Sequence, residues 1–163
     1  MLREGNEPVP ATLTELDYKS IITQDAKQAF GELLSGLAPW QWFFTMTFRK
    51  RVGLWAAQRM WSRFWIEEQR LFGRLNWFRA TEYQSWRGVP HFHALITGIP
   101  AEYNTESCRL MAKEIANDIA GFTRIYEYDS SLGASYYLAK YTVKELGDIQ
   151  FTRGILRGNL TKN

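Results

Sequence analysis

Hydrophobic and polar residues alternate in some parts of the chain and recur at helical spacing in others. Residues 40–48 are rich in aromatic side chains and threonine, a pattern that predicts a strand. Residues 54–72 place apolar side chains three or four positions apart, which predicts an amphipathic helix. The segments 75–84 and 91–97 are typical of strands, and the intervening turn near residues 86–88 predicts that they pair as a hairpin.

The same reasoning extends toward both ends of the chain. The N-terminal part is expected to be helical, most clearly over residues 24–37. An apolar stripe along residues 105–120 predicts a second amphipathic helix, with Asn104 as its N-cap and Gly121 as its stop. Residues 122–128 then predict a strand.

The C-terminal part adds two further elements. A helix is expected to begin at Asp129 or Ser130 and to run to about Leu146, and a short edge strand is expected near residues 149–152. The main elements therefore follow a βαββαβ order, with an extra C-terminal helix.

This order predicts an α+β fold with a ferredoxin-like or RRM-like βαββαβ core. In such a core the sheet is antiparallel and its helices cover one face, which leaves the other face for an extra helix or a nucleic acid. We divide the chain into an N-terminal extension with a helix, residues 1–39, and a main domain, residues 40–163.

Composition narrows the function classes. Hydrophobic residues make up 45% of the 163 residues, which is typical of a globular domain. No apolar run approaches the roughly 18 residues that a membrane span needs. The first twenty residues have no apolar core of a signal peptide, and the single cysteine, Cys108, cannot form an internal disulfide, so we expect a cytoplasmic protein.

The basic residues suggest an acidic partner through their arrangement more than through the net charge of +3. The basic residues Arg49, Lys50, Arg51, Arg79 and Arg87 are predicted to contact DNA. The chain is also 15% aromatic, and rings beside cations suit single-stranded nucleic acid, whose bases stack on them. The alternative is that most of these rings belong to the core.

Both histidines of the chain lie in His91-Phe92-His93. Side chains alternate along a strand, so the two imidazoles share a face and Phe92 points the other way. A hairpin that turns near residue 87 places Glu82 opposite this pair, with Gln84 as the substitute if the register slips by two residues. We therefore predict a divalent-metal site at Glu82, His91 and His93; the alternative is two ordinary surface or core histidines.

A second constellation lies on the predicted C-terminal helix. At 100° per residue, Tyr137, Lys140, Tyr141 and Lys144 share one polar face, whereas Tyr136 lies near the edge of the apolar face. The two ammonium groups can neutralise phosphate charge and hold it near the phenols. The alternative is an ordinary amphipathic surface helix.

Three motifs together resemble those of the HUH endonucleases, and most closely the rolling-circle replication initiators of plasmids and small single-stranded DNA phages. Residues 44–48 look like the first motif, a strand of the form F-x-hydrophobic-T. Residues 90–96 look like the metal-binding strand, and residues 137–144 look like the YxxKYxxK helix of the two-tyrosine initiators. The motifs occur in the family's order.

The resemblance implies that residues 40–163 form an HUH endonuclease domain that nicks single-stranded DNA and transfers strands through a 5′-phosphotyrosine. It implies Tyr137 as the nucleophile, aided by Lys140 and Lys144, with His91 and His93 as metal ligands. Tyr141 is expected to be a second nucleophile; the alternative is that it only packs or contacts phosphate.

The cofactor is expected to be Mn²⁺ or Mg²⁺, since phosphate and carboxylate oxygens suit hard cations. The expected partners are single-stranded DNA at a replication origin and the replication helicase and polymerase of a bacterial or archaeal host, with no membrane. Two alternatives stay open. One is a single-strand transposase or relaxase of the same superfamily, although relaxases usually have a third histidine. The other is a non-catalytic RRM-like module that binds single strands.

Overall fold

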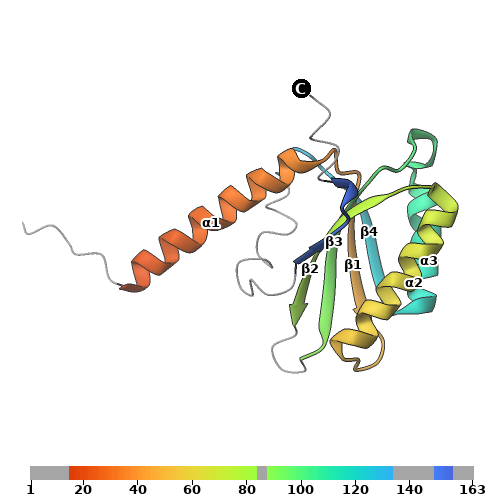
Figure 1. Ribbon diagram of the computed structural model, residues 1–163, viewed down its shortest axis with the longest axis horizontal. Helices are drawn as coiled ribbons and strands as arrows, with labels where there is room; N and C mark the ends of the chain where they lie inside the picture. The colour runs from red at the N-terminus through yellow and green to blue at the C-terminus, as the bar shows by residue number, and fades with distance from the viewer. Residues whose placement is uncertain (1–14, 84–87, 134–148, 156–163) are drawn as a thin grey trace, which may run out of the picture.

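The computed structural model describes residues 15–83, 88–133 and 149–155. These residues form helices and strands that follow one another along the chain in the order shown by the colours of Figure 1. The helices are α1 (Glu15–Leu37), α2 (Leu54–Phe72), the short 3₁₀ helix η1 (Ala101–Tyr103) and α3 (Glu106–Ile119). The strands are β1 (Trp42–Phe48), β2 (Asn76–Tyr83), β3 (Pro90–Thr97), β4 (Gly121–Glu127) and β5 (Ile149–Phe151).

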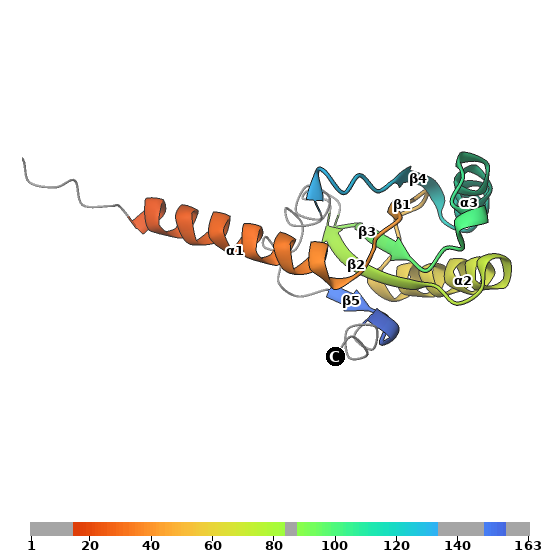
Figure 2. The ribbon, with the colours of Figure 1, turned by 90° about the horizontal axis from the view of Figure 1, so that it is seen from above.

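The strands form one five-stranded sheet in the order β4-β1-β3-β2-β5, and every pairing is antiparallel. The succession β1-α2-β2-β3-α3-β4 is the ferredoxin-like arrangement, and the order of its four strands follows that fold. Figures 1 and 2 show α2 and α3 on one side of the sheet, with α1 extending away on the other. The predicted α+β class is confirmed, as is the short edge strand, which pairs with β2.

The main core lies between the sheet and the α2–α3 layer. On β1, Trp42, Phe44, Met46 and Phe48 are buried while the residues between them are half-buried. The Phe44 ring stacks on Phe64 of α2, with ring centroids 4.8 Å apart. Burial of such large rings supplies most of the energy that fixes α2 against the sheet.

A second, smaller apolar cluster covers part of the opposite face. Leu34 of α1 and Trp40 pack there against Phe78 of β2 and Leu95 of β3, and all four are buried. The indole Nε1 of Trp40 donates a hydrogen bond to the carbonyl of Leu34, at 2.7 Å. This cluster covers the end of the sheet where β1 begins. The domain boundary after residue 39 stays a prediction, although Leu34 shares this cluster with the sheet.

The N-cap of α3 differs from the prediction. The helix is capped by Thr105, whose hydroxyl accepts a hydrogen bond from the amide of Cys108 at 3.2 Å. Asn104 is instead held by the core, because its side-chain carbonyl oxygen accepts from Nε1 of Trp42 at 2.7 Å. A tertiary hydrogen bond to a buried indole has taken the residue that local capping rules favoured.

Gly121 does not simply stop α3 but opens β4, with a φ of 136° that favours glycine. A Cβ at this position would lie only 2.5 Å from the Cβ of Arg49 and 2.6 Å from its backbone nitrogen. The Arg49 amide donates to the carbonyl of Ala120 at 2.9 Å. Gly121 thus allows the chain leaving β1 to lie directly against the start of β4.

One carboxyl group lies deep in the core. Glu68 of α2 is 1% exposed, and its Oε1 has no hydrogen-bond partner among the described residues. Burial raises the pKa of this carboxyl to about 8, because the charged form is poorly solvated. At neutral pH the group is therefore protonated in the folded protein and ionised in the unfolded chain.

Glu68→Gln is expected to stabilise the protein, by an amount that grows with pH. A folded-state pKa raised from 4.5 to about 8 means that the folded wild type holds a proton that the unfolded chain has released. Its free energy of unfolding therefore falls as the pH rises from about 4.5 to 8. The gain from Glu68→Gln should be small near pH 4 and reach roughly 3–5 kcal/mol above pH 8.

The measurement is urea unfolding of the wild type and the variant between pH 4 and 8.5. Glu67→Gln is the matched control, since this neighbouring carboxylate is on the surface and pairs with Arg70 at 2.9 Å. It should change stability by no more than about 0.5 kcal/mol. Parallel stability curves for the wild type and Glu68→Gln across this pH range would contradict the prediction.

Candidate active site

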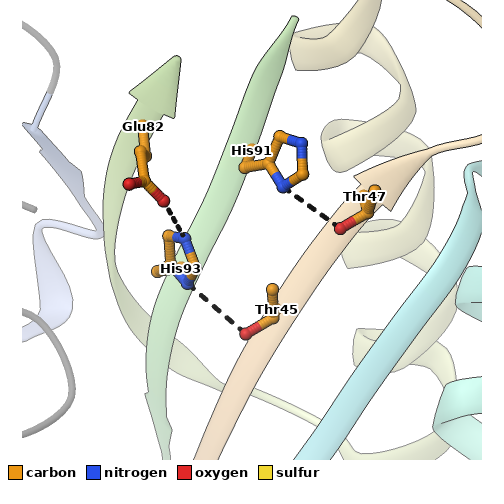
Figure 3. A network of polar contacts seen from close by, with 5 residues as sticks. All are labelled: Thr45, Thr47, Glu82, His91 and His93. Carbon is orange, nitrogen blue, oxygen red and sulfur yellow. Dashed lines mark hydrogen bonds and ion pairs between the residues drawn. The ribbon is translucent and has the colours of Figure 1, made fainter. Parts of the chain in front are cut away.

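The predicted site residues lie at the end of the sheet that the α1 cluster leaves open. His91 and His93 stand on the face of β3 opposite Phe92, which packs into the α2 core. In the β2–β3 hairpin Glu82 is paired with His91, so the carboxylate shares the histidine face. The structure thus brings all three predicted ligands onto one face, and Figure 3 shows them with Thr45 and Thr47 of β1.

His93 lies between a carboxylate and a hydroxyl. Its Nε2 is 3.2 Å from Oε2 of Glu82, and its Nδ1 is 3.4 Å from the hydroxyl of Thr45 (Figure 3). An ionised carboxylate only accepts, so Nε2 carries the hydrogen in this arrangement and Nδ1 accepts from Thr45. A hydroxyl can also accept, so the Thr45 contact persists when the proton moves to Nδ1 and frees the lone pair of Nε2.

His91 is arranged in a similar way but lacks a second contact. Its Nδ1 lies 3.3 Å from the hydroxyl of Thr47. Its Nε2 is buried and has no hydrogen-bond partner in the described part of the chain. Burial lowers the pKa of His91 below its usual 6.5, and the charge of Glu82 offsets this only in part. The ring is therefore neutral at physiological pH, which is the form that binds a metal ion.

The donor set fits a divalent ion in its chemistry. Two ligands bound to one ion at about 2.1 Å lie roughly 3.0–3.4 Å apart, and the Glu82 oxygen and the His93 nitrogen are 3.2 Å apart. The buried, unpartnered Nε2 of His91 is a further nitrogen donor on the same face. However, no three His, Cys, Asp or Glu side chains of the described ranges converge closely enough to form a complete metal site. Closing it would require the side chain of His91 or Glu82 to turn.

Thr45 and Thr47 are site residues that the sequence patterns did not single out. They alternate with the buried residues Phe44, Met46 and Phe48, so their side chains lie on the open face. The register pairs Thr45 with His93. A hydrogen bond to the second imidazole nitrogen orients a metal-binding histidine, and these hydroxyls are placed to provide it. Alternation in the first motif was the signal that could have found them.

The basic residues 49–51 follow β1 directly and are exposed. β1 ends beside the start of β3, so this cluster lies at the same end of the sheet as His91. Arg49 and Lys50 also line a surface pocket with Asp118 of α3. Their proximity to the histidine end suits phosphate binding, which stays a prediction for Arg49, Lys50 and Arg51.

The prediction that Arg79 contacts DNA is wrong. Arg79 is 1% exposed and lies on the α2 side of the sheet, opposite the histidines. Its guanidinium carbon is 4.0 Å from the centroid of the Phe92 ring, and its Nη2 donates to Gln150 at 2.8 Å. A guanidinium packed on a core ring and bound to β5 is a structural group with no access to a phosphate.

Several predicted residues lie outside the described ranges, so their roles stay predictions. Arg87 and Gln84 belong to the β2–β3 turn. The others belong to the predicted nucleophile helix: Tyr136, Tyr137, Lys140, Tyr141 and Lys144.

The fold and this row of polar residues define a class of α+β domain whose antiparallel sheet carries a histidine pair and a carboxylate on its open face. The chain belongs to the family of replication-associated proteins of the ORF2 type, whose model matches residues 41–146. The match begins at β1 and includes the histidine strand and the Tyr–Lys segment. No curated protein and no solved structure matches the chain significantly.

Family membership shows that the protein is replication-associated, and it agrees with the resemblance to the nuclease domain of rolling-circle initiators. It also favours a replication role over a transposase or relaxase. Among the described residues, no helix combines the length and apolar character needed to cross a bilayer.

Proposed function

We propose that this protein initiates rolling-circle replication by nicking single-stranded DNA at an origin and holding the 5′ end on a tyrosine. The observation that carries the proposal is the pair of imidazoles on the open sheet face, each with Nδ1 beside a threonine hydroxyl and with Glu82 next to His93. In a replication-associated protein, such a donor set beside exposed basic residues suits the binding of a scissile phosphate.

The chemical step assigned to Tyr137 is an in-line displacement at phosphorus. The phenol oxygen forms a bond to phosphorus and loses its proton, and the bond between phosphorus and the 3′ oxygen breaks. That oxygen takes up a proton and leaves as a free 3′-hydroxyl. The 5′-phosphotyrosine keeps the energy of one phosphodiester, so a later attack by a 3′-hydroxyl rejoins DNA without ATP.

Tyrosine has a reference pKa near 10 and is a weak nucleophile at neutral pH, so the site must stabilise negative charge. A divalent ion, Mn²⁺ or Mg²⁺, held by Glu82, His91 and His93 would supply positive charge to the non-bridging phosphate oxygens. Thr45 and Thr47 orient the two imidazoles. Lys140, Lys144 and the basic residues 49–51 neutralise neighbouring phosphates.

The proposed setting is the cytoplasm of a bacterial or archaeal host. A freed 3′-hydroxyl is a primer for a polymerase, and the displaced strand must be unwound. The host replication polymerase and helicase are therefore the partners that the reaction requires.

A covalent protein–DNA adduct is the expected product when the wild type is incubated with single-stranded oligonucleotides tiled across the parent replicon's origin and 1 mM Mn²⁺. It should appear as a shifted band on a denaturing gel and vanish when chelator is added before the DNA. The same oligonucleotides as perfect duplexes are the control and should give little adduct. A protein that binds these oligonucleotides but never forms an adduct would be a binding module, and the proposal would fail.

A further inference from the structure

The outward face of β4 carries a row of three residues beside the candidate active site. Phe122, Arg124 and Tyr126 are paired with Thr47, Thr45 and Phe43 of β1. Directly paired residues share a face, so the three side chains stand on the histidine face of the sheet. They lie one strand beyond the threonines and two strands, roughly 10 Å, from the histidines.

This row is open to solvent although two of its members are large aromatic residues. Phe122 is 53% exposed and Tyr126 is 51% exposed, and Arg124 between them is also exposed. The guanidinium carbon of Arg124 lies 5.2 Å from the centroid of the Phe122 ring. The intervening residues behave differently, since Thr123 is buried and Ile125 packs against the core. The strand therefore buries one face normally and presents rings and a cation on the other.

We propose that Phe122, Arg124 and Tyr126 form a stacking platform for the single-stranded DNA on which the candidate site acts. The two rings take bases, and Arg124 binds the phosphate backbone between them. Phe122 and Tyr126 are four residues apart, about 13 Å along a strand, so they serve bases separated by two or more nucleotides. The choice of DNA rests on the proposed function.

Single-stranded DNA fits this surface better than a duplex does. The faces of bases are free only in single strands, and a duplex offers phosphates but no ring to stack on except at its ends. The cation in the middle of the row matches the charge of a backbone. β4 is also an edge of the sheet, opposite the β5 edge (Figure 2), so a strand lying on the platform continues across β1 toward the histidines.

A similar ring–cation pair elsewhere on the molecule provides a matched control. The guanidinium carbon of Arg59 lies 4.7 Å from the Trp55 ring centroid, and Trp55 is 69% exposed. This pair lies on α2, which covers the opposite side of the sheet (Figure 2). Trp55 offers the same chemistry as the platform on the face without histidines.

The test measures binding separately from cleavage. A fluorescent twelve-nucleotide poly-dT strand is titrated with protein in excess chelator, and anisotropy gives the affinity. Phe122→Ala and Tyr126→Ala should each weaken binding by about 5- to 100-fold. Arg124→Ala should lower the slope of log affinity against log salt by about 0.7. Trp55→Ala and Arg59→Ala should change affinity less than 2-fold.

The platform is wrong if the ring variants, shown by circular dichroism to be folded, bind poly-dT as the wild type does. It is equally wrong if Trp55→Ala weakens binding as much, or if poly-U RNA binds more tightly than DNA. Phe122→Leu keeps the apolar contact but not the ring and should behave like Phe122→Ala. If these variants lose binding while the wild type forms no adduct, the platform stands and the proposed nicking fails. If nicking occurs and the ring variants bind and nick normally, only the platform fails.

Discussion

Tyr137→Phe is expected to abolish the covalent adduct, lowering its rate of formation by more than about 10³-fold, because the phenylalanine ring has no oxygen to attack phosphorus. The substitution removes one atom from a residue that the helical pattern places on a polar face with Lys140 and Lys144. DNA binding in chelator should therefore stay close to that of the wild type. Gel quantification of the adduct and anisotropy of the labelled strand measure the two effects separately.

The neighbouring tyrosines provide matched controls for the same one-atom change. Tyr136 is rotated about 100° from Tyr137 toward the apolar side of the predicted helix, so Tyr136→Phe should leave the adduct intact. Tyr141 lies one turn from Tyr137 on the same face, so Tyr141→Phe should nick normally but fail to close circles if it is a second nucleophile. Peptide mapping of the adduct identifies the residue used. An adduct on Tyr136 would show that the helical phase is wrong.

The sheet could be predicted in detail because its information is local. Residues of the first motif alternate in burial as period-two geometry requires, and the turn fixes the β2–β3 hairpin to within one residue of the expected register. Glu82 therefore lies where counting across the turn placed it, opposite His91. The contacts of α1 with the sheet could not be predicted, since they join residues that no short turn connects. Trp40 and Leu34 meet β2 and β3 only through tertiary packing.

The face occupied by Arg79 was available from counting but was overlooked. Arg79 and Glu82 are three positions apart on one strand, and an odd separation places them on opposite faces. A basic residue on the α2 side could not serve an ion held by Glu82. Proximity along the sequence was a poor guide, because successive residues of a strand face two different environments.

The β4 platform illustrates what requires a structure. The alternation of Phe122, Arg124 and Tyr126 is visible in the sequence, but alternation alone does not say which face of the sheet they share. β4 pairs with β1 across a separation of about eighty residues, and only the observed register places Arg124 opposite Thr45. Their exposure depends in turn on what covers that face, which is a property of the whole fold.

His93→Ala and His91→Ala are each expected to lower adduct formation by more than about 100-fold. Loss of a partner that only orients a metal ligand typically costs 10- to 100-fold, so loss of the ligand itself should cost more. Adding Mn²⁺ to ten times the wild-type optimum should not restore activity, because the donor atom is gone. The same variants should bind Mn²⁺ weakly in electron paramagnetic resonance titrations, a measurement that does not depend on DNA.

Thr45→Val separates orientation from ligation within the same site. It removes the hydroxyl 3.4 Å from Nδ1 of His93 and keeps the shape of the side chain. Its Mn²⁺ affinity should fall about 10-fold, and excess Mn²⁺ should restore nicking, since both imidazoles remain. Thr97→Val is the matched control: its hydroxyl donates to Pro39 at 2.7 Å, at the end of β3 away from the histidines. It should lower stability without changing the Mn²⁺ dependence. Nicking by the His91→Ala/His93→Ala double variant in excess chelator would mean that the histidines hold no catalytic metal.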